Sequence, residues 1–600
     1  MDVSTRQAKP TLLLLLTLCL PIFGAQHALA LGSQAKQEPL SVSTLNHSLE
    51  ASLSTQIPHN TPTTPEALAW LKEAKQGDAE AQYNLALLYL NGIDVQQSHR
   101  SAYFWFLQAA KSQQADAQYN LGVMLENGLG TSKNVTSAVF WYKKAAKQKD
   151  LDAANNLGVM YETGSGVSQD FAKAAHWYRQ AALLGNALAQ NNLAVLYESG
   201  KGVDRSHNKA FLWFLKSAEQ RNSDAQLSLG AMYEYGLGTP VDNARAAFWY
   251  EQSARQKNVS AQYNLALMYE NGRGVKQDYS KALQWFSKAA AKKDADAQNS
   301  LGFFYQYGHG VSQNYQTSYH WYLKAAQQGH AEAQFAIGLH HREGLGRKSN
   351  NEVAAKWYLR SAKQGYDFAQ NNLAILFHKG EGIKQSFKQA HHWYLKAAKQ
   401  DNATAQYNLG TLYEKGLGVT LNTQQAFHWY EKAAKSGYRD AQFNLGILYE
   451  QGIGTKQDYT SAINWYLKAA KQGDSFAQNN LGALYQNGQG THKNAKKAAF
   501  WYAKAATSGN AVSQNNLASL YWKGDGVTQD TTTAADLFFQ SAKQNNADAQ
   551  FNIPYFFEQG IAVQQDTEQA IIWYRKASEQ GIAQARSKLY DLTKVKKHSR

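Results

Sequence analysis

The sequence predicts an all-α solenoid of fourteen 36-residue helix–turn–helix repeats, and three observations predict it. The glutamine of an Ala-x-Ala-Gln motif recurs every 36 residues from Gln82 to Gln550, and only the third repeat lacks it, with Ala154 in its place. A glycine follows each of these positions at a constant distance, starting at Gly92. A Trp-Tyr or Trp-Phe pair recurs at the same period, and only Leu537 interrupts the run of tryptophans. A fixed period of this length is typical of arrays that grow in one dimension by stacking units.

The N-terminal segment predicts export. Arg6 and Lys9 precede an apolar core, and Ala28-Leu29-Ala30 is a small-x-small cleavage site, so residues 1–30 are interpreted as a signal peptide cut near Ala30. We therefore expect a periplasmic or secreted protein. Cys19 is the only cysteine and is lost with the signal, so disulfides play no part. Residues 31–63 are rich in Ser, Thr, Pro and Gln and are expected to form a disordered linker.

The first helix of each repeat, called helix A, is expected at about Ala79–Asn91 in the first unit. Ala81, Leu85, Leu88 and Tyr89 share one face of it at helical spacing. Glycine ends helix A in every unit because the residue after the last turn takes a left-handed conformation that glycine adopts without strain.

The second helix, called helix B, begins at a position that holds only Ser, Asn or Asp. These residues cap a helix by accepting a hydrogen bond from a free backbone N–H, which stabilises each helix by about 1 kcal/mol. Small and aromatic residues then alternate along helix B, so that alanines allow close approach of helices and aromatic side chains fill the space between neighbouring repeats. One repeat cannot bury its apolar face alone, and the units must therefore stack. The capping residues are Ser98, Asn134, Asp170, Ser206, Asp242, Asp278, Asn314, Asn350, Ser386, Asn422, Asp458, Asn494, Asp530 and Asp566.

The two ends of the array are expected to be capped. Residues 64–78 predict an N-terminal capping helix with Pro65 at its first position. Fourteen repeats then occupy residues 79–582, and residues 583–600 are a C-terminal capping helix with a basic tail. Pro554 lies in the middle of the last helix A and predicts a kink there.

The repeat resembles the Sel1-like repeat, a relative of the tetratricopeptide repeat. The resemblance is carried by Ala-x-Ala-Gln-x-Asn-Leu-Gly-x-x-Tyr-x-x-Gly followed by Ala-x-x-Trp-Tyr-x-Lys-Ala-Ala, and it covers roughly residues 65–592. It implies a right-handed superhelix of helix pairs that scaffolds protein complexes, with helix A lining the concave groove. Bacterial proteins that this chain resembles are typically exported envelope regulators, assembly factors or host-interaction proteins.

The outer face of helix A is the predicted partner-binding site. A solvated face is expected to be rich in lysine and glutamate, but one position here is asparagine in eleven repeats and its neighbour is often aromatic. We hypothesise that the amides grip an extended peptide backbone; the alternative is that they bond neighbouring helices and set the superhelical pitch. The residues are Asn84, Asn120, Asn156, Asn192, Asn264, Asn372, Asn408, Asn444, Asn480, Asn516 and Asn552, with Tyr83, Tyr119, Tyr263 and Tyr407 beside them.

Other readings of the sequence are less well supported. Some secreted Sel1-like proteins have been called β-lactamases, and Ser206-x-x-Lys209 and Lys435-Ser436-Gly437 resemble β-lactamase motifs. However, Ser206 is a helix cap, and no Ser-Asp-Asn motif occurs. Neither catalysis nor a cofactor is therefore expected. Binding to a cell-wall or other anionic polymer is the alternative function, since the formal charge is +15. A eukaryotic secretory adaptor is a third reading, from sequons at Asn46, Asn134, Asn258 and Asn402. Nucleic acid and a membrane span are not expected.

Five histidines gather in the eighth and ninth repeats. They are His340, His341, His378, His391 and His392. Adjacent histidines point about 100° apart on a helix, and no acidic or histidine partner completes a ligand set, so no metal is predicted and a packing or surface role is favoured.

Overall fold

The computed structural model describes residues 62–598, and within that range it contains thirty α-helices and no strand. The predicted signal peptide and most of the predicted linker lie outside the described residues. Helices with odd numbers from α3 to α29 are the A helices, and helices with even numbers from α4 to α30 are the B helices. The bounds are α2 (Pro65–Lys75), α3 (Ala79–Asn91), α4 (His99–Lys111), α5 (Ala115–Asn127), α6 (Val135–Lys147), α7 (Leu151–Thr163), α8 (Phe171–Leu183), α9 (Ala187–Ser199), α10 (His207–Glu219), α11 (Ser223–Tyr235), α12 (Asn243–Arg255), α13 (Val259–Asn271), α14 (Tyr279–Ala291), α15 (Ala295–Tyr307), α16 (Tyr315–Gln327), α17 (Ala331–Glu343), α18 (Asn351–Lys363), α19 (Asp367–Lys379), α20 (Phe387–Ala398), α21 (Ala403–Lys415), α22 (Thr423–Lys435), α23 (Arg439–Gln451), α24 (Tyr459–Lys471), α25 (Ser475–Asn487), α26 (Ala495–Thr507), α27 (Ala511–Lys523), α28 (Thr531–Lys543), α29 (Ala547–Gln559), α30 (Thr567–Glu579) and α31 (Ala583–His598).

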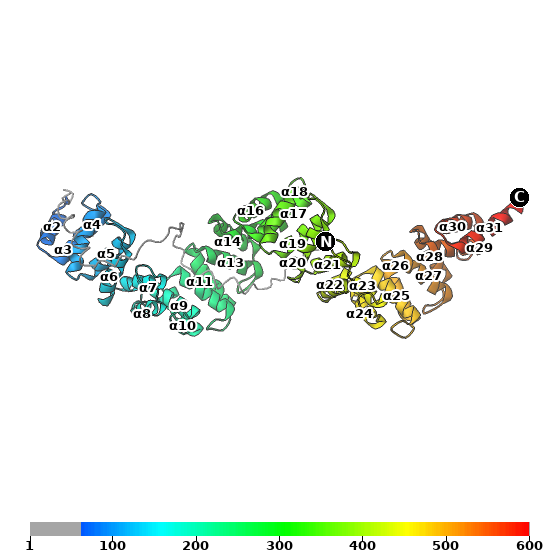
Figure 1. The fold of residues 1–600 in the computed structure, drawn as a ribbon, viewed down its shortest axis with the longest axis horizontal. Helices are drawn as coiled ribbons and strands as arrows, with labels where there is room; N and C mark the ends of the chain where they lie inside the picture. The colour runs from blue at the N-terminus through cyan, green and yellow to red at the C-terminus, as the bar shows by residue number, and fades with distance from the viewer. Residues whose placement is uncertain (1–61, 599–600) are drawn as a thin grey trace. The chain divides into compact units, whose positions relative to one another are not determined.

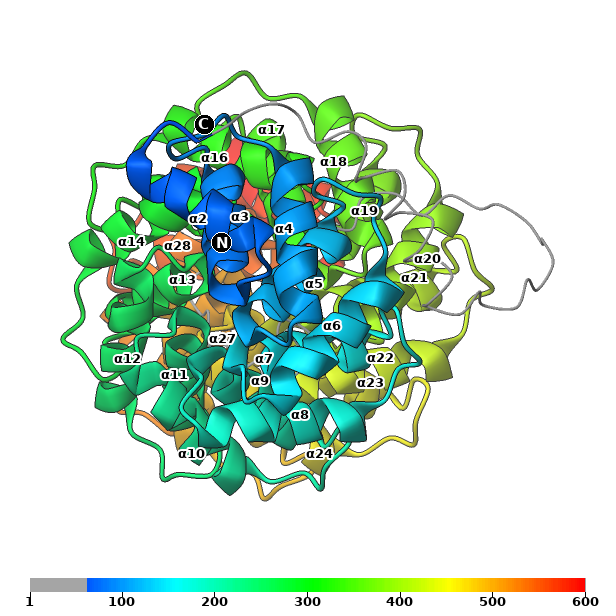
Figure 2. The same ribbon diagram turned by 90° about the vertical axis from the view of Figure 1, so that its left-hand side faces the viewer.

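The chain forms two compact units. The first runs to Ala297 and includes His309–Val311, and the second comprises Gln298–Gly308 and continues from Ser312. In each unit the helices follow one another in chain order, and neighbours in sequence are neighbours in space (Figure 1). The end-on view shows the short turns that join successive helices of the first unit (Figure 2). The prediction of an all-α solenoid is confirmed.

The predicted helix boundaries follow from local chemistry. Each of the fourteen B helices begins after a Ser, Asn or Asp whose side chain accepts a hydrogen bond from a backbone N–H of the first turn, as Asn422 does from the N–H of Gln425 at 2.9 Å. At the end of α3, Gly92 has φ of 69° and its N–H donates to the carbonyl of Leu88.

In every repeat but the last, the core is built by a small residue of helix A against a ring of helix B. In eight repeats the small residue is glycine, and a Cβ on Gly446 would lie 2.5 Å from the ring of Tyr466. The hydroxyl of this fully buried tyrosine donates to the carboxylate of Glu450 on helix A. Glycine is therefore required wherever the tyrosine is held in this way.

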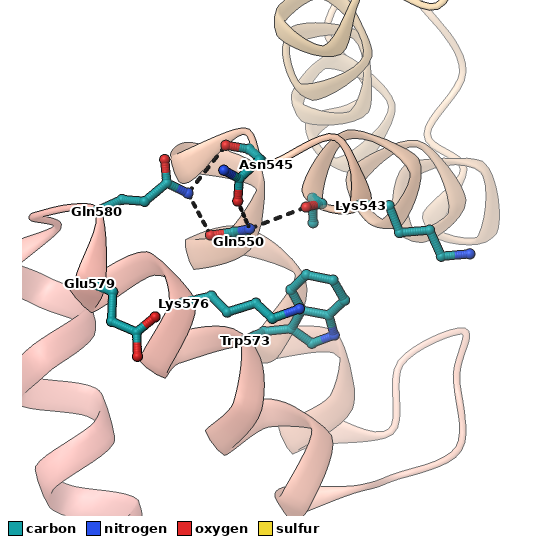
Figure 3. A pocket seen from close by; sticks show the side chains of 8 residues that line it. Lys543, Asn545, Gln550, Trp573, Lys576, Glu579 and Gln580 are labelled. Atoms are coloured by element: carbon teal, nitrogen blue, oxygen red, sulfur yellow. Dashed lines mark hydrogen bonds between the residues drawn. The ribbon is translucent and has the colours of Figure 1, made fainter.

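Most of the repeat glutamines connect three helices, whereas the Oε1 atoms of Gln82, Gln262, Gln406 and Gln478 accept no hydrogen bond. The Nε2 of Gln550 donates to the carbonyl of Ala542 at 3.2 Å, and its Oε1 accepts from Gln580 of the following helix B at 2.7 Å (Figure 3). The same pair of bonds occurs at Gln190, with Ala182 and Gln220. These buried amides are structural because both ends of the side chain are used between repeats.

Twelve repeats have a second glycine in the turn between helices A and B, where the backbone lies close to the preceding repeat. A Cβ on Gly130 would lie 2.1 Å from the carbonyl oxygen of His99, at the start of the preceding helix B. The first repeat has Asp94 at this position, with φ of 59°, and Asp94 instead accepts hydrogen bonds from Thr63 and Thr64. The turn is therefore a point of close backbone contact between repeats.

The helices at the ends differ little from the rest. Thr64 caps α2, with Pro65 in its first turn. Helix α29 continues through Pro554 from Ala547 to Gln559, so the proline does not interrupt the helix. Pro554 occupies the position that holds glycine or alanine in the other repeats and is itself buried.

Candidate functional site

The predicted site residues lie on the more open face of the A helices. In α3, Ala81, Gln82 and Leu85 are buried, whereas Tyr83 and Asn84 are half-buried. All eleven asparagines of the predicted row are half-buried in the same way. The face of helix A that the sequence predicted to lie away from the packing is thus the face that reaches solvent, and its side chains are half-buried.

Several of the row's amides bond the neighbouring repeat. Asn192 donates to the Oδ1 of Asn155 at 3.0 Å, and Asn552 donates to the Oδ1 of Asn515 at the same distance. Asn516 donates in the same way to the Oδ1 of Asn479 at 3.4 Å. These hydrogen bonds join one A helix to the next, which is the alternative function considered for the asparagine row. Gripping a peptide remains a hypothesis.

Acidic residues surround the tyrosines of the first unit. Burial raises the pKa of Tyr83, and the carboxylates of Asp116 and Glu80 raise it further. Burial also raises the pKa of Asp150, with Asp152 and Asp116 adding to the effect. The tyrosines therefore stay neutral hydrogen-bonding groups at neutral pH.

An aromatic patch occupies this face in the second unit. Its rings touch from one repeat to the next: Phe335 contacts Tyr366 with centroids 5.3 Å apart, and Tyr366 contacts Phe368 at 5.7 Å. Further along, Phe443 contacts Phe476 at 6.1 Å. The A-face aromatic patch comprises three groups of touching rings on successive repeats: Phe335, Tyr366 and Phe368; Tyr407 and Tyr438; and Phe443 and Phe476.

Two phenylalanines of the patch stand in solvent. Phe368 is 54 % exposed and Phe476 is 63 % exposed. They occupy the second position of helix A, which is Asp or Glu in eight repeats, where a carboxylate interacts favourably with the helix dipole. Folding gives no reason for phenylalanine at this position. Sequence reasoning missed both residues, although the change from acidic to aromatic at a fixed repeat position was visible.

The histidines do not form a common site. His340 is fully buried and lies within hydrogen-bonding distance of the Oε1 of Gln306 (3.2 Å) and the carbonyl of Leu345 (3.2 Å). Burial lowers its pKa to about 4. His391 bonds the hydroxyl of Tyr413 at 3.0 Å. Within residues 62–598 no group of three or more His, Cys, Asp or Glu side chains is placed to hold a metal ion.

The serine of the β-lactamase-like motif has a structural function. The Oγ of Ser206 accepts the backbone N–H of Lys209 at 3.3 Å and caps α10. Lys435 pairs with Glu431 at 2.9 Å on the surface of α22. Both residues are used by their own helices.

Comparison with known families assigns the repeats. The Sel1 repeat matches fourteen successive segments: 79–113, 115–150, 151–186, 187–222, 223–258, 259–294, 295–330, 331–366, 367–402, 403–438, 439–474, 475–510, 511–546 and 547–582. The chain is a Sel1 repeat protein. Sel1 repeat proteins generally mediate protein–protein interactions, and their solenoid is a typical non-catalytic scaffold.

Solved structures of other Sel1 repeat proteins are similar to this one. A protective antigen present in uropathogenic Escherichia coli strains, which displays the SLR fold, is 33 % identical, and the match covers 82 % of this chain and 97 % of the antigen with a TM-score of 0.61. A Sel1 repeat protein from Oxalobacter formigenes is 32 % identical, and the match covers 54 % of this chain and 93 % of that protein with a TM-score of 0.43. No curated protein matches the chain significantly. In the described part of this Sel1 repeat protein, no helix has the length and apolar character needed to cross a membrane.

Proposed function

We propose that this Sel1 repeat protein is a non-catalytic scaffold of the bacterial envelope, or a secreted one, that holds a segment of another protein against its A-helix face. The observation that carries the proposal is the A-face aromatic patch. Exposed aromatic side chains that are clustered on a fixed scaffold are the usual anchors of protein interfaces. The partner belongs to envelope-complex assembly or to host contact.

Two features support a partner of extended conformation. The patch runs from one repeat to the next along successive A helices, so a partner chain laid across them meets an aromatic ring in each of several repeats. The half-buried asparagines beside the rings retain amide groups at the edge of the same face. Rings supply contact area and amides supply hydrogen bonds to a peptide backbone.

The location outside the cytoplasm rests on the signal-like segment at residues 1–30 and on the relative from uropathogenic Escherichia coli, which is described as a protective antigen. A fusion of residues 1–60 to alkaline phosphatase, an enzyme active only after export, tests this location. Phosphatase activity is expected for the native segment and should be lost when Leu13, Leu14 and Leu15 are replaced by aspartate.

The binding surface is tested with two pairs of exposed phenylalanines. A partner is first identified by affinity capture on residues 31–600, and its dissociation constant is then measured with purified proteins. The Phe368→Ser, Phe476→Ser variant should bind about thirtyfold more weakly or worse, because truncating an aromatic anchor costs an interface about 2 kcal/mol. The control replaces Phe248 and Phe500 of the B helices, which are 51 % and 53 % exposed, and should leave the affinity unchanged.

The asparagine row is tested separately. Asn372→Ala, Asn408→Ala and Asn444→Ala together should weaken partner binding without changing the helical circular dichroism if the amides grip the partner. A fall in thermal stability with unchanged affinity would assign the row to the stitching of repeats. Equal loss of affinity in the A-face and B-face phenylalanine variants would refute the A-face as the binding surface.

A further inference from the structure

A row of cations runs along the B helices of the second unit, on a surface separate from the A-face. Each B helix from α16 to α26 carries a lysine or arginine three residues after its tryptophan, and each of these side chains is exposed. The helix-B cation row consists of Lys324, Arg360, Lys396, Lys432, Lys468 and Lys504. The charged groups lie 3.7 to 5.6 Å from the centroids of the tryptophan rings beneath them. The same arrangement, with Lys576 over Trp573, is visible in Figure 3.

The cations of the row have no anionic partner among the described residues. The ion pairs of these helices join other side chains, as Lys356 does with Glu352 at 2.6 Å and Lys435 with Glu431 at 2.9 Å. An indole ring attracts a cation weakly and leaves its outer side in water. Each charge of the row is therefore available to an external anion.

The row is also not required for folding. Four other repeats have glutamine at the same position, namely Gln108, Gln180, Gln252 and Gln540. Their B helices α4, α8, α12 and α28 are each 13 residues long and have the same kind of capped start as the B helices of the row. Because the chain folds with a neutral residue at this position, the six consecutive cations of the second unit need another explanation.

Charge is separated between the two kinds of helix. The six B helices of the row contain 13 lysines and arginines and only two acidic residues, Glu352 and Glu431. The six A helices α17, α19, α21, α23, α25 and α27 contain five basic and six acidic residues. The excess positive charge of the unit is thus a property of the B surface, which gives that surface an attraction for anions that the A-face lacks.

The cations lie over the joints between repeats. Trp357 packs against the buried cluster of Tyr322 and Ala325, and Trp465 packs against that of Ala426 and Tyr430, so both tryptophans rest on the preceding repeat. The charges above them are therefore one repeat apart, a distance on the order of 10 Å or more, the separation of packed helices. This separation is close to the Debye length of about 10 Å in 0.1 M salt, so each cation of the row interacts with an anion largely as a separate charge.

Polar rings flank the row. His320, His392 and His428 are exposed, and each stands edge-on to its neighbouring tryptophan with centroids 5.1 to 5.8 Å apart. Their ring nitrogens offer hydrogen bonds beside three of the six cations, Lys324, Lys396 and Lys432. A membrane-surface helix carries apolar side chains in such places, and among the six equivalent residues of the row only Phe500 is apolar.

We infer that the helix-B cation row binds a linear acidic polysaccharide, with its carboxylates at the cations and its hydroxyls at the histidines. A linear ligand matches a linear row. Double-stranded DNA carries a charge about every 1.7 Å of its axis, far denser than the row, whereas a carbohydrate chain combines widely spaced carboxylates with many hydroxyls. The inference is independent of the proposed function, because it concerns the opposite kind of helix.

The test compares two variants of equal charge on residues 31–600. The row variant carries Lys324→Gln, Lys396→Gln, Lys432→Gln and Lys468→Gln, substitutions that other repeats show to be compatible with the fold. The control variant carries Lys348→Gln, Lys384→Gln, Lys456→Gln and Lys493→Gln, which are exposed in the turns between helices A and B. Circular dichroism and thermal melting verify that both are folded, and fluorescence anisotropy measures binding of labelled polygalacturonate oligomers of increasing length.

Native protein should bind polygalacturonate more tightly as the oligomer lengthens, and neutral dextran should not bind. The row variant should bind about tenfold more weakly or worse, with a shallower dependence on salt, and the control should stay within about twofold. Equal weakening in both variants would reduce the effect to net charge and overturn the inference. So would absence of binding to polygalacturonate, or row-dependent binding to oligothymidylate or phosphatidylglycerol vesicles alone. None of these outcomes depends on the A-face phenylalanines.

Discussion

Replacing Gly446 by alanine tests whether a glycine of helix A is fixed by a single ring. The new Cβ would lie 2.5 Å from two ring carbons of Tyr466 and 3.1 Å from a third. The ring has little room to move because it is fully buried and its hydroxyl is bonded to Glu450. Overpacking of this kind costs about 3 kcal/mol, and the better helix propensity of alanine returns about 1 kcal/mol. The expected net loss is about 2 kcal/mol.

Hydrogen exchange is the suitable assay, because a long repeat array does not unfold in one two-state step. A loss of about 2 kcal/mol should speed the exchange of peptides from α23 and α24 by roughly thirtyfold. Peptides from α3 and α4 should exchange at the native rate and serve as an internal control.

The rescue by Tyr466→Phe makes the test specific. Four repeats that have alanine at the glycine position pair it with phenylalanine: Phe106, Phe214, Phe286 and Phe538. The fifth pairs Ala374 with Tyr394, which lies beside His378 instead of a glutamate. The Gly446→Ala, Tyr466→Phe variant should therefore recover more than half of the lost protection. If the single variant exchanges at the native rate, or if the double variant is no better than the single one, the argument from the anchored ring is wrong.

Three further predictions concern stability. Because burial lowers the pKa of His340 to about 4 from an unfolded value near 6.5, the neutral ring favours the folded state above pH 6.5, and about 3 kcal/mol of local stability is lost as the pH falls to 4. His340→Leu should abolish this dependence in the hydrogen-exchange protection factors of peptides from α17 at pH 4 and pH 7. Burial raises the pKa of Tyr466 and its equivalents above 10, and that of Tyr502 to about 12, so the neutral tyrosines contribute to folding stability below pH 10 and this contribution is lost above it. Phenolate absorbance and loss of helical signal should therefore rise together between pH 10 and 12. Separate transitions would contradict this prediction. Asn422→Ala should cost α22 about 1 kcal/mol in exchange protection, whereas Asn422→Asp should retain most of it.

The sequence was sufficient to predict the repeats because each helix is specified locally. A cap such as Asn422 and an end such as Gly92 act within one turn of the chain, and the period repeats the signal fourteen times. Contacts between repeats were not predictable in the same way. The bond from Asn192 to Asn155 joins residues 37 apart, and its existence depends on how two A helices cross.

The candidate site shows the same limit. The outer face of helix A was identified from its periodicity, but whether an amide on it is free or bonded to a neighbour depends on the distance between repeats. Phe368 and Phe476 are exposed because they lie at the start of helix A, and this position could be read from the sequence. The cation row was hidden for a different reason, since the sequence shows lysines without showing which of them have an acidic neighbour.

The close turn at Gly130 bears on how such a chain changes its length. The twelve interior repeats all have glycine at this position, so any of them can be copied and inserted between two others without a collision. A copy of the first repeat placed inside the array would bring the side chain of Asp94 against the backbone of the repeat before it. Gain and loss of units by recombination should therefore be confined to the interior, which leaves the two terminal repeats as fixed ends while the middle of the protein varies in number.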